Sequence, residues 1–160
     1  MYKQIIIARK DLNMSAGKLA SQVSHASMAF LTNAIRKGEK ELKNREIYNF
    51  DFFNPFPLVY DVKLRIDKDI YDEWIDGTFT KIILQAKNKN QLEKVVTLAN
   101  ELKLKEGRDY FLIKDNCYTE LKPEEIDEDG IGRTLTCIGF RPLPSEIIDK
   151  IGKKYHIWED

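Results

Sequence analysis

A short apolar run near the start of the chain leads, after one loop, into a long helix. Residues 4–8 read QIIIA, and this β-branched run is typical of a strand buried on both faces. Ser15 then offers a helix N-cap, and the helical pattern continues to about residue 37. A strand followed by a loop and a helix predicts an α/β fold. It also places the helix start at the carboxyl end of the strand, where open sheets bind ligands.

The helix expected over residues 16–37 has an apolar face and a polar stripe. The apolar positions share one arc and are expected to face the core: Leu19, Val23, Ala26, Phe30 and Ala34. The polar stripe on a different arc consists of Lys18, Gln22 and His25. A lysine in the first turn opposes the helix dipole, which favours anions there by about 0.3–1 kcal/mol. The lysine and the free amides of that turn could together bind a phosphate, a carboxylate or an oxyanion. A lysine that is simply solvated is an equally good interpretation.

Composition favours one domain and excludes several classes of protein. The 160 residues, 42% of them hydrophobic, suit a single domain over residues 1–160. The two cysteines and two histidines do not form a disulfide scaffold or a zinc pattern, so neither a metal nor a cofactor is expected. The apolar run is too short for a signal peptide or a membrane span, and we expect a cytoplasmic protein without membrane contact.

Charge is unevenly distributed along a chain whose formal net charge is zero. Residues 1–45 contain nine basic and three acidic side chains, so the basic part of the chain surrounds the predicted helix. Residues 36–45 are expected to continue or follow the helix on its solvated side. Residues 120–129 contain six acidic side chains and lack the spacing of a calcium loop, so we expect an exposed loop that faces away from any nucleic acid.

The remaining elements follow from periodicity and from glycine and proline positions. Residues 48–57 are rich in aromatics and interrupted by two prolines. They are interpreted as an inserted flap packed on the domain, with base stacking as the alternative. Strands are expected at residues 58–66, 80–86, 110–113 and 133–139, and helices at 67–74, 89–104 and 145–151.

Two polar residues stand at predicted strand ends. Asp115 follows the strand at 110–113, from where a carboxylate can reach a shared cleft, although a turn-forming aspartate is the simpler interpretation. Thr134 opens the last strong strand, where threonine is usually a sheet former and only sometimes a catalytic hydroxyl. Alternation in this strand predicts one face with Thr134, Thr136 and Ile138, and another with Leu135 and Cys137.

The order of motifs resembles the type II peptidyl-tRNA hydrolases of archaea and eukaryotes. The resemblance covers roughly residues 4–37 and 79–158, and it rests on DLNMSAGKLASQVSHA, TKIILQA with its helix, LIKDNCYTEL and TLTCIGFRPLPSEIIDKI. It implies an α/β, three-layer-like domain whose mixed, mostly four-stranded sheet is flanked by helices, often in a homodimer. It also implies metal-independent cleavage of the ester between a peptide and tRNA. The usual catalytic candidates of that family correspond here to Lys18, Asp115 and Thr134.

The resemblance suggests a role for each polar residue near the predicted site. As a hypothesis, Asp115 holds or deprotonates water, Lys18 and first-turn amides stabilise an oxyanion or phosphate, and Thr134 orients substrate. A structural hydrogen bond is expected for His25 in preference to catalysis, although it lies on the stripe expected to line the site. The candidate substrate-binding residues are Arg9, Lys10, Gln22, His25, Asn116, Thr119 and Arg141.

Three departures from the family pattern leave alternatives open. Residues 116–118 read NCY in place of a glycine-containing segment with an arginine, and Arg141 is a candidate to replace that arginine. A Gly-Ile-Gly-Pro turn is replaced by CIGFRP at residues 137–142. The segment at about 38–78 is longer than the family core requires, and it can cover the cleft, extend tRNA contact or build a dimer. The alternatives to peptidyl-tRNA hydrolysis are a non-catalytic tRNA- or protein-binding relative and a hydrolase of another acylated tRNA.

Overall fold

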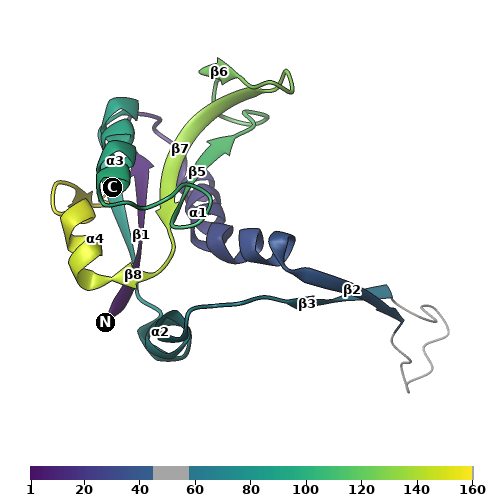
Figure 1. Cartoon of the computed structure of the whole chain (residues 1–160). Coiled ribbons are helices and arrows are strands. Elements are labelled where there is room, and N and C mark those ends of the chain that lie inside the picture. The colour runs from purple at the N-terminus through teal and green to yellow at the C-terminus, as the bar shows by residue number, and fades with distance from the viewer. Residues whose placement is uncertain (45–57, 160) are drawn as a thin grey trace.

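The computed structural model describes residues 1–44 and 58–159, so the predicted flap at 48–57 lies outside the described residues. Helices and strands alternate along most of the chain (Figure 1). The elements are β1 (Tyr2–Arg9), α1 (Ala16–Lys37), β2 (Glu39–Asn44), β3 (Leu58–Lys63), α2 (Lys68–Ile70), a wide helix η1 (Tyr71–Thr78), β4 (Lys81–Ala86), α3 (Lys89–Glu101), β5 (Tyr110–Asp115), β6 (Glu125–Ile126), β7 (Gly132–Phe140), β8 (Leu143–Pro144), α4 (Ser145–Gly152) and β9 (His156–Ile157).

A mixed sheet forms the centre of the molecule, in the strand order β5-β7-β1-β4-β9. β1 and β4 are parallel, whereas β7 runs antiparallel to both β1 and β5. The short strands β6 and β8 extend the pairing at the ends of β7 and β1. The α/β class with a mixed sheet between helices is therefore confirmed, with four long strands supplemented by the short strands β6, β8 and β9.

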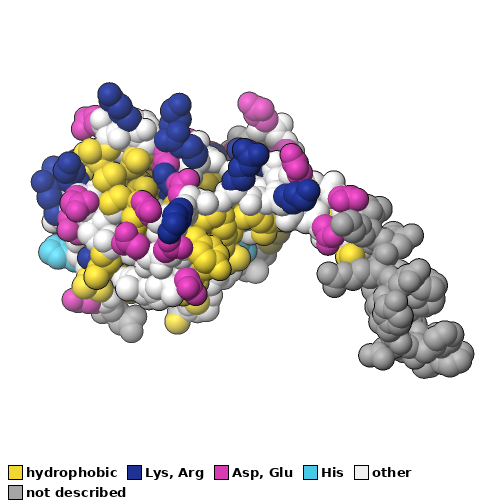
Figure 2. Space-filling view, turned by 60° about the horizontal axis from the view of Figure 1, so that its bottom comes forward, with side chains coloured by type: hydrophobic (Ala, Val, Ile, Leu, Met, Phe, Trp, Pro, Cys, Tyr) yellow, Lys and Arg dark blue, Asp and Glu magenta, His cyan; other side chains and the backbone are white. Residues whose placement is uncertain are grey.

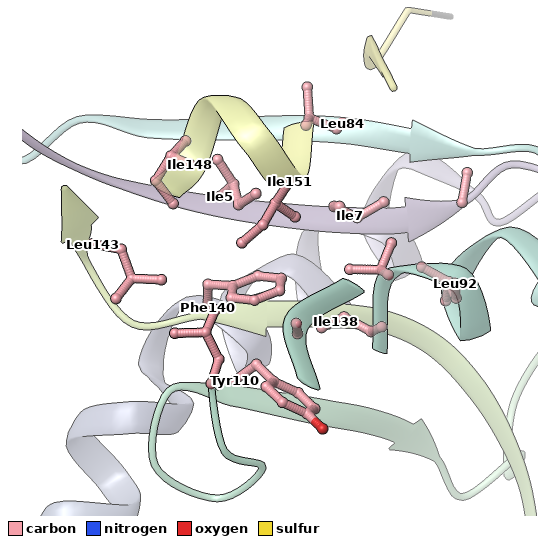
Figure 3. Packing of buried hydrophobic residues seen from close by; sticks show 14 of the residues in the cluster. Ile5, Ile7, Leu84, Leu92, Tyr110, Ile138, Phe140, Leu143, Ile148 and Ile151 are labelled. Atoms are coloured by element: carbon pink, nitrogen blue, oxygen red, sulfur yellow. The ribbon is translucent and has the colours of Figure 1, made fainter. Parts of the chain in front are cut away.

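The larger part of the core lies between the sheet and helices α3 and α4 (Figure 3). Ile5 and Ile7 of β1 meet Leu92 of α3 and Ile151 of α4 there, and Phe140 of β7 packs beside them. The intervening residues of β1, Ile6 and Ala8, point to the opposite face. Burial of both faces explains the continuous apolar run that predicted this strand.

Helix α1 covers the opposite face of the sheet. The Ser15 hydroxyl accepts a hydrogen bond from the amide of Lys18, so the predicted N-cap is confirmed. Ala26 is buried against the sheet, where a Cβ on Gly139 of β7 would lie 2.4 Å from the Ala26 carbonyl oxygen. Gln22 is also buried, at 3% exposure, so the sheet-facing side of α1 includes part of the predicted polar stripe.

A β-bulge in β7 corrects the predicted alternation of that strand. Ile113 of β5 pairs with Cys137 and the next residue, Lys114, pairs with Leu135, so Thr136 is an extra residue. Cys137 consequently packs with Ala26 on the α1 side, whereas Ile138 joins Leu135 in the larger core. The predicted grouping of Ile138 with the threonines, and of Cys137 with Leu135, is wrong because the bulge reverses the alternation.

Residues 39–44 form a strand after the helix, so of the two expectations for residues 36–45, that they continue the helix is wrong and that they follow it is confirmed. α1 ends at Lys37, and β2 then pairs antiparallel with β3, from Glu39 opposite Lys63 to Asn44 opposite Leu58. Figure 1 shows this two-stranded ribbon extending away from the body of the molecule, from the end of α1 opposite Ser15. The described strands of the ribbon therefore do not cover the start of α1. Among the described residues, no helix is long and apolar enough to cross a membrane.

Candidate active site

The side chains of Lys18 and Asp115 form an ion pair where the start of α1 meets the end of β5. The Lys18 ammonium lies 2.7 Å from Asp115 Oδ1, and the two side chains are only 13% and 11% exposed. The ammonium also donates to the Thr119 hydroxyl at 3.1 Å. Of the polar groups expected near the site, Lys18, Asp115 and Thr119 are thus brought together, although residues 18 and 115 are far apart in the sequence.

Gln22 completes the support of Asp115 from inside the protein. Its Nε2 donates to Asp115 Oδ1 at 3.0 Å, and the Thr136 hydroxyl lies 2.7 Å from Gln22 Oε1. A carboxylate only accepts hydrogen bonds, so the amide nitrogen must face Asp115 and the amide oxygen must face Thr136. The Asp115 carboxylate thus sets the orientation of Gln22, and the Thr136 hydroxyl, which also lies 3.0 Å from the Ile113 carbonyl oxygen, supports it by donating to Gln22. The bulge in β7 brings Thr136 to this position.

The pair keeps hydrogen-bonding capacity for a ligand. An ammonium has three N–H donors, and within the described residues two of those on Lys18 are used, by Asp115 and Thr119. Asp115 Oδ2 accepts from the amide of Cys117 at 3.0 Å and, among the described groups, from no other donor. One N–H of Lys18 and one lone pair of Asp115 Oδ2 are consequently available to water or substrate.

A small pocket of about 250 Å³ opens beside the pair. Its lining residues are Lys18, Gln22, His25, Lys114, Asp115, Asn116, Tyr118 and Thr119. Tyr118, from the segment at 116–118 that replaces the family's glycine-containing segment with an arginine, is 75% exposed at this pocket. His25 is exposed and makes no hydrogen bond within the described part of the chain, so its expected structural hydrogen bond is wrong.

The loop after β5 is fastened to both Asp115 and the start of α1. Cys117 adopts a left-handed backbone with φ of 57°, and its amide donates to the Asp115 carboxylate at 3.0 Å. Glu120 accepts hydrogen bonds from the hydroxyl and the amide of Ser15, both at 2.7 Å. These bonds hold the pKa of Glu120 below its usual range. The first-turn anion site therefore holds a carboxylate of the protein itself, and the residues that line the pocket lie deeper along α1.

Arg9 is buried in an ion-pair network, in contrast to its expected contact with tRNA. Its guanidinium is 3% exposed and donates to Asp11, Glu124 and the Leu135 carbonyl, which engages all five N–H groups. Burial disfavours its charge, but these hydrogen bonds outweigh burial and raise its pKa. Glu124 belongs to the acidic stretch expected to face away from nucleic acid, and in the fold it neutralises Arg9.

Two of the other three candidates, Lys10 and Arg141, lie apart from the Lys18 pocket, whereas Thr134 is paired with Asp115 in the sheet. Lys10 bonds to the Glu159 carbonyl and lies over the Trp158 ring, 4.7 Å from its centroid. Arg141 donates to Asp109 and Asp67, near the other end of α1. The Thr134 hydroxyl is fully buried, donating to the Lys122 carbonyl and accepting from the Glu124 amide and from the Cys117 thiol at 3.4 Å. It fastens the loop before β7, and this geometry does not fit the expected role of Thr134 in orienting substrate.

The described residues provide neither a metal-binding group nor an exposed Cys137 thiol beside this pocket. Within residues 1–44 and 58–159, no group of three or more His, Cys, Asp or Glu side chains is placed to hold a metal ion. Cys137 is completely buried, and burial raises the pKa of its thiol to about 12. Asn116, the last of the predicted substrate-binding residues, lies on the pocket wall and accepts from Arg133.

Sequence reasoning missed Thr136, Tyr118 and Glu120 as parts of the site. Thr136 shares a predicted strand face with Thr134, so alternation alone offered a signal for it. Glu120 had no such signal, because its bond to Ser15 depends on how the loop after β5 folds back to α1.

Comparison with known proteins places this site in a family. A family model described as peptidyl-tRNA hydrolase PTH2 matches residues 2–158. The chain is 28% identical over 155 residues to the peptidyl-tRNA hydrolase of Thermoplasma acidophilum, covering 97% of each protein. It is 30% identical over 151 residues to that of Methanopyrus kandleri, covering 94% of this chain and 93% of the relative. The chain therefore belongs to the PTH2 family of peptidyl-tRNA hydrolases.

Proposed function

We propose that this protein hydrolyses the ester bond between a peptide, or an N-blocked aminoacyl group, and tRNA. The observation that carries the proposal is the Lys18–Asp115 pair, held in a pocket with one donor and one acceptor available to a ligand. Ester hydrolysis needs an acceptor for the proton of water and a donor for the oxyanion. The substrate arises at the ribosome, so we also propose that the protein acts in the cytoplasm.

The reaction follows from the two available groups. Asp115 Oδ2 accepts a hydrogen bond from water and takes its proton as the water oxygen attacks the ester carbonyl carbon. The free N–H of Lys18 donates to the carbonyl oxygen as that oxygen gains negative charge. When the bond to the ribose oxygen breaks, that oxygen takes the proton from Asp115. The products are a peptide with a free carboxyl group and tRNA with a free terminal hydroxyl.

The proposal assigns separate roles to the surrounding residues. Gln22 and the Cys117 amide hold the Asp115 carboxylate in place, and Thr119 holds the Lys18 ammonium. His25, Asn116 and the exposed Tyr118 ring line the pocket and are proposed to contact the end of tRNA. A single domain over residues 1–160 with an added segment at about 38–78, and assembly as a homodimer, remain predictions.

Release of tRNA from N-acetylaminoacyl-tRNA by the purified protein tests this function. Lys18→Ala and Asp115→Asn are each expected to lower kcat by about 10²-fold or more, because general acid–base groups contribute on that scale. Lys150→Ala on α4 is a matched control, since this lysine is exposed on the other side of the sheet.

Three results would contradict parts of the proposal. Absence of turnover by the wild-type protein would exclude the hydrolase and leave a tRNA- or protein-binding relative. Cleavage restricted to aminoacyl-tRNA with a free amino group would identify another acylated tRNA as substrate. Full activity in both variants would retain the hydrolase but exclude the roles given to Lys18 and Asp115.

A further inference from the structure

A second pocket, of about 550 Å³, lies at the opposite end of α1 from the Lys18–Asp115 pair. We name it the junction pocket, and the residues that define it here are Phe30, Asn33, Lys37, Arg65, Arg108 and Arg141. The Asn33 side chain donates to the Gly107 carbonyl at 2.7 Å, which fastens α1 to the turn before β5. Arg65 lies in the segment between β3 and α2. The pocket is therefore formed jointly by the end of α1, the turn before β5 and that segment.

The junction pocket is rich in positive charge. Lys37, Arg65, Arg108 and Arg141 line it, and Asp67 is the carboxylate among its lining residues. In Figure 2, Lys and Arg side chains lie on the body of the molecule beside the base of the ribbon, with some acidic side chains among them. Such a concentration of cations around a concave site favours an anionic ligand.

Two of these cations are held in place by a buried carboxylate. Asp109 is completely buried and accepts from Arg108, Arg141 and the Lys105 amide. Asp67 accepts from Arg141 as well, which leaves one guanidinium nitrogen of Arg141 without a bond to the described residues. The arrangement fixes two planar guanidinium groups at the pocket, and this group is suited to bidentate recognition of phosphate.

The other two cations have no counter-ion in the described part of the chain. Neither Lys37 nor Arg65 makes a hydrogen bond or an ion pair with another described residue, and both are exposed. Together with Arg108 and Arg141 they outnumber the two carboxylates that contact the cluster. The pocket therefore retains positive charge that the described residues do not neutralise.

The junction pocket and the active site lie along one helix at a defined separation. α1 is continuous from Lys18 to Lys37, and nineteen steps of about 1.5 Å place these residues about 28 Å apart along its axis. β5 runs back beside it, from the turn at Gly107 to Asp115. A single nucleotide bound at the active site is too short to bridge this separation, whereas a polynucleotide can.

We propose that the junction pocket binds the phosphate backbone of the acceptor arm of tRNA, several nucleotides away from the ester held at Lys18 and Asp115. The proposal rests on the proposed function, because that function places the end of a tRNA in the active site. A tRNA whose end lies at the catalytic pair can place a backbone phosphate in the basic pocket at the other end of α1. The pocket thus recognises the tRNA body and carries no part of the chemistry.

The test compares two substrates and one double variant. The substrates are N-acetylaminoacyl-tRNA and an N-acetylaminoacyl ester of the trinucleotide CCA, which is too short to reach the junction pocket. In the Lys37→Gln/Arg65→Gln variant, KM for the full tRNA is expected to rise roughly tenfold with kcat unchanged. The salt slope of log(kcat/KM) is expected to fall by about two, one for each lost phosphate contact. The rise in KM and the smaller salt slope are expected with the full tRNA and not with the CCA ester.

A matched variant separates local binding from net charge. Lys150→Gln/Lys153→Gln removes two positive charges from exposed positions at α4, on the other side of the sheet. It is expected to leave KM for full tRNA within twofold of the wild type. Thermal melting of both double variants checks that the fold is retained.

Four results would overturn the proposal. The first is an unchanged KM for full tRNA in Lys37→Gln/Arg65→Gln, and the second is an equal rise in KM for both substrates in that variant. The third is an equal rise in KM for full tRNA in the α4 variant. The fourth is that Lys37→Gln/Arg65→Gln abolishes binding of pyrophosphate while its affinity for tRNA stays intact. Fluorescence anisotropy with deacylated tRNA measures the same affinity without turnover. An inactive wild-type protein whose tRNA affinity depends on Lys37 and Arg65 would therefore refute the hydrolase and support the pocket.

Discussion

At the scale of single residues, Gln22 links the reacting carboxylate to the bulge in β7. Its amide has only one orientation in which Asp115 receives a hydrogen, and the Thr136 hydroxyl supports that orientation by donating to Gln22 Oε1. If Thr136 could not donate, Gln22 Oε1 would lose its buried partner, and the side chain that supports Asp115 would be held less firmly. Thr136 is therefore a positioning residue that acts through Gln22.

Thr136→Val tests this relay with a side chain of almost the same shape. It is expected to lower kcat by roughly tenfold with KM nearly unchanged, because the variant misplaces the proton acceptor without removing a substrate contact. Loss of the buried hydroxyl is expected to cost about 1–2 kcal/mol of unfolding free energy. Steady-state kinetics and urea denaturation measure the two effects.

Two further threonine variants distinguish positioning from simple destabilisation. Thr136→Ser keeps the hydroxyl and is expected to restore kcat, whereas Thr134→Val is expected to lower stability because Thr134 fastens the loop before β7. Equal kcat in Thr136→Val and Thr136→Ser would contradict the relay. A larger loss of kcat in Thr134→Val than in Thr136→Val would return Thr134 to the catalytic role suggested by the resemblance.

At the scale of elements, α1 approaches β7 more closely than any residue but glycine allows at position 139. An added Cβ would lie 2.4 Å from the Ala26 carbonyl oxygen and 2.9 Å from the Ala26 Cβ, both far inside normal contact distance. Since one of these atoms belongs to the helix backbone, a side-chain rotation cannot relieve the clash. The helix that carries Lys18 and Gln22 would have to move away from the sheet.

Gly139→Ala is accordingly expected to destabilise the protein by about 1–3 kcal/mol and to lower activity, since overpacking displaces backbone. Chemical denaturation measures the change. Gly17→Ala is the control, because a Cβ on Gly17 meets no atom within 4 Å and alanine favours helices. A Gly139→Ala variant as stable as Gly17→Ala would show that α1 is packed less tightly than described.

The sequence predicted elements whose pattern is local and missed those that depend on distant partners. β1, α1, β4 and α3 have strong apolar periodicity and were found within a few residues. β2 reads EKELKN, which favours a helix locally, and it becomes a strand because β3 supplies its hydrogen bonds. The bulge in β7 depends in the same way on its register with β5.

The residues of the site show the same difference between local pattern and distant contacts. The resemblance identified Lys18 and Asp115, but only the fold determines that their charged atoms lie 2.7 Å apart. Arg9 is a residue type that often contacts phosphate, but here its guanidinium is bound by Glu124, which lies 115 positions later in the chain. Thr134 occupies the expected place in the sequence, whereas the bulge gives the neighbouring Thr136 the contact with the site.

At the scale of the whole molecule, the Arg9 network links β1 to the acidic stretch and makes stability depend on pH. Hydrogen bonds from Arg9 hold the pKa of Glu124 below its usual range in the folded state, against the opposing effect of burial. Glu124 therefore contributes stability above its unfolded pKa of about 4.3. That contribution is lost as the pH falls through the lower, folded pKa.

Glu124→Gln is expected to lower the unfolding free energy by about 1–2 kcal/mol at pH 7, because Arg9 is buried while Glu124 is 32% exposed. The difference from wild type is expected to shrink between pH 5 and pH 3, and thermal melts across this range measure it. Glu128→Gln provides the control, since Glu128 is exposed and has no ion pair among the described residues. A difference that stays constant down to pH 3 would contradict the assigned cause.

The bond from Ser15 to Glu120 has a consequence for how the active site opens. The loop that supplies Glu120 also supplies Thr119 and the Cys117 amide, so the helix start and both reacting groups are fastened by one short segment. Detachment of that segment would release the Ser15 amide and remove one support from Lys18 and one from Asp115. Exchange of the Ser15 amide hydrogen with solvent therefore reports how often this segment detaches from the site, in the absence of any substrate.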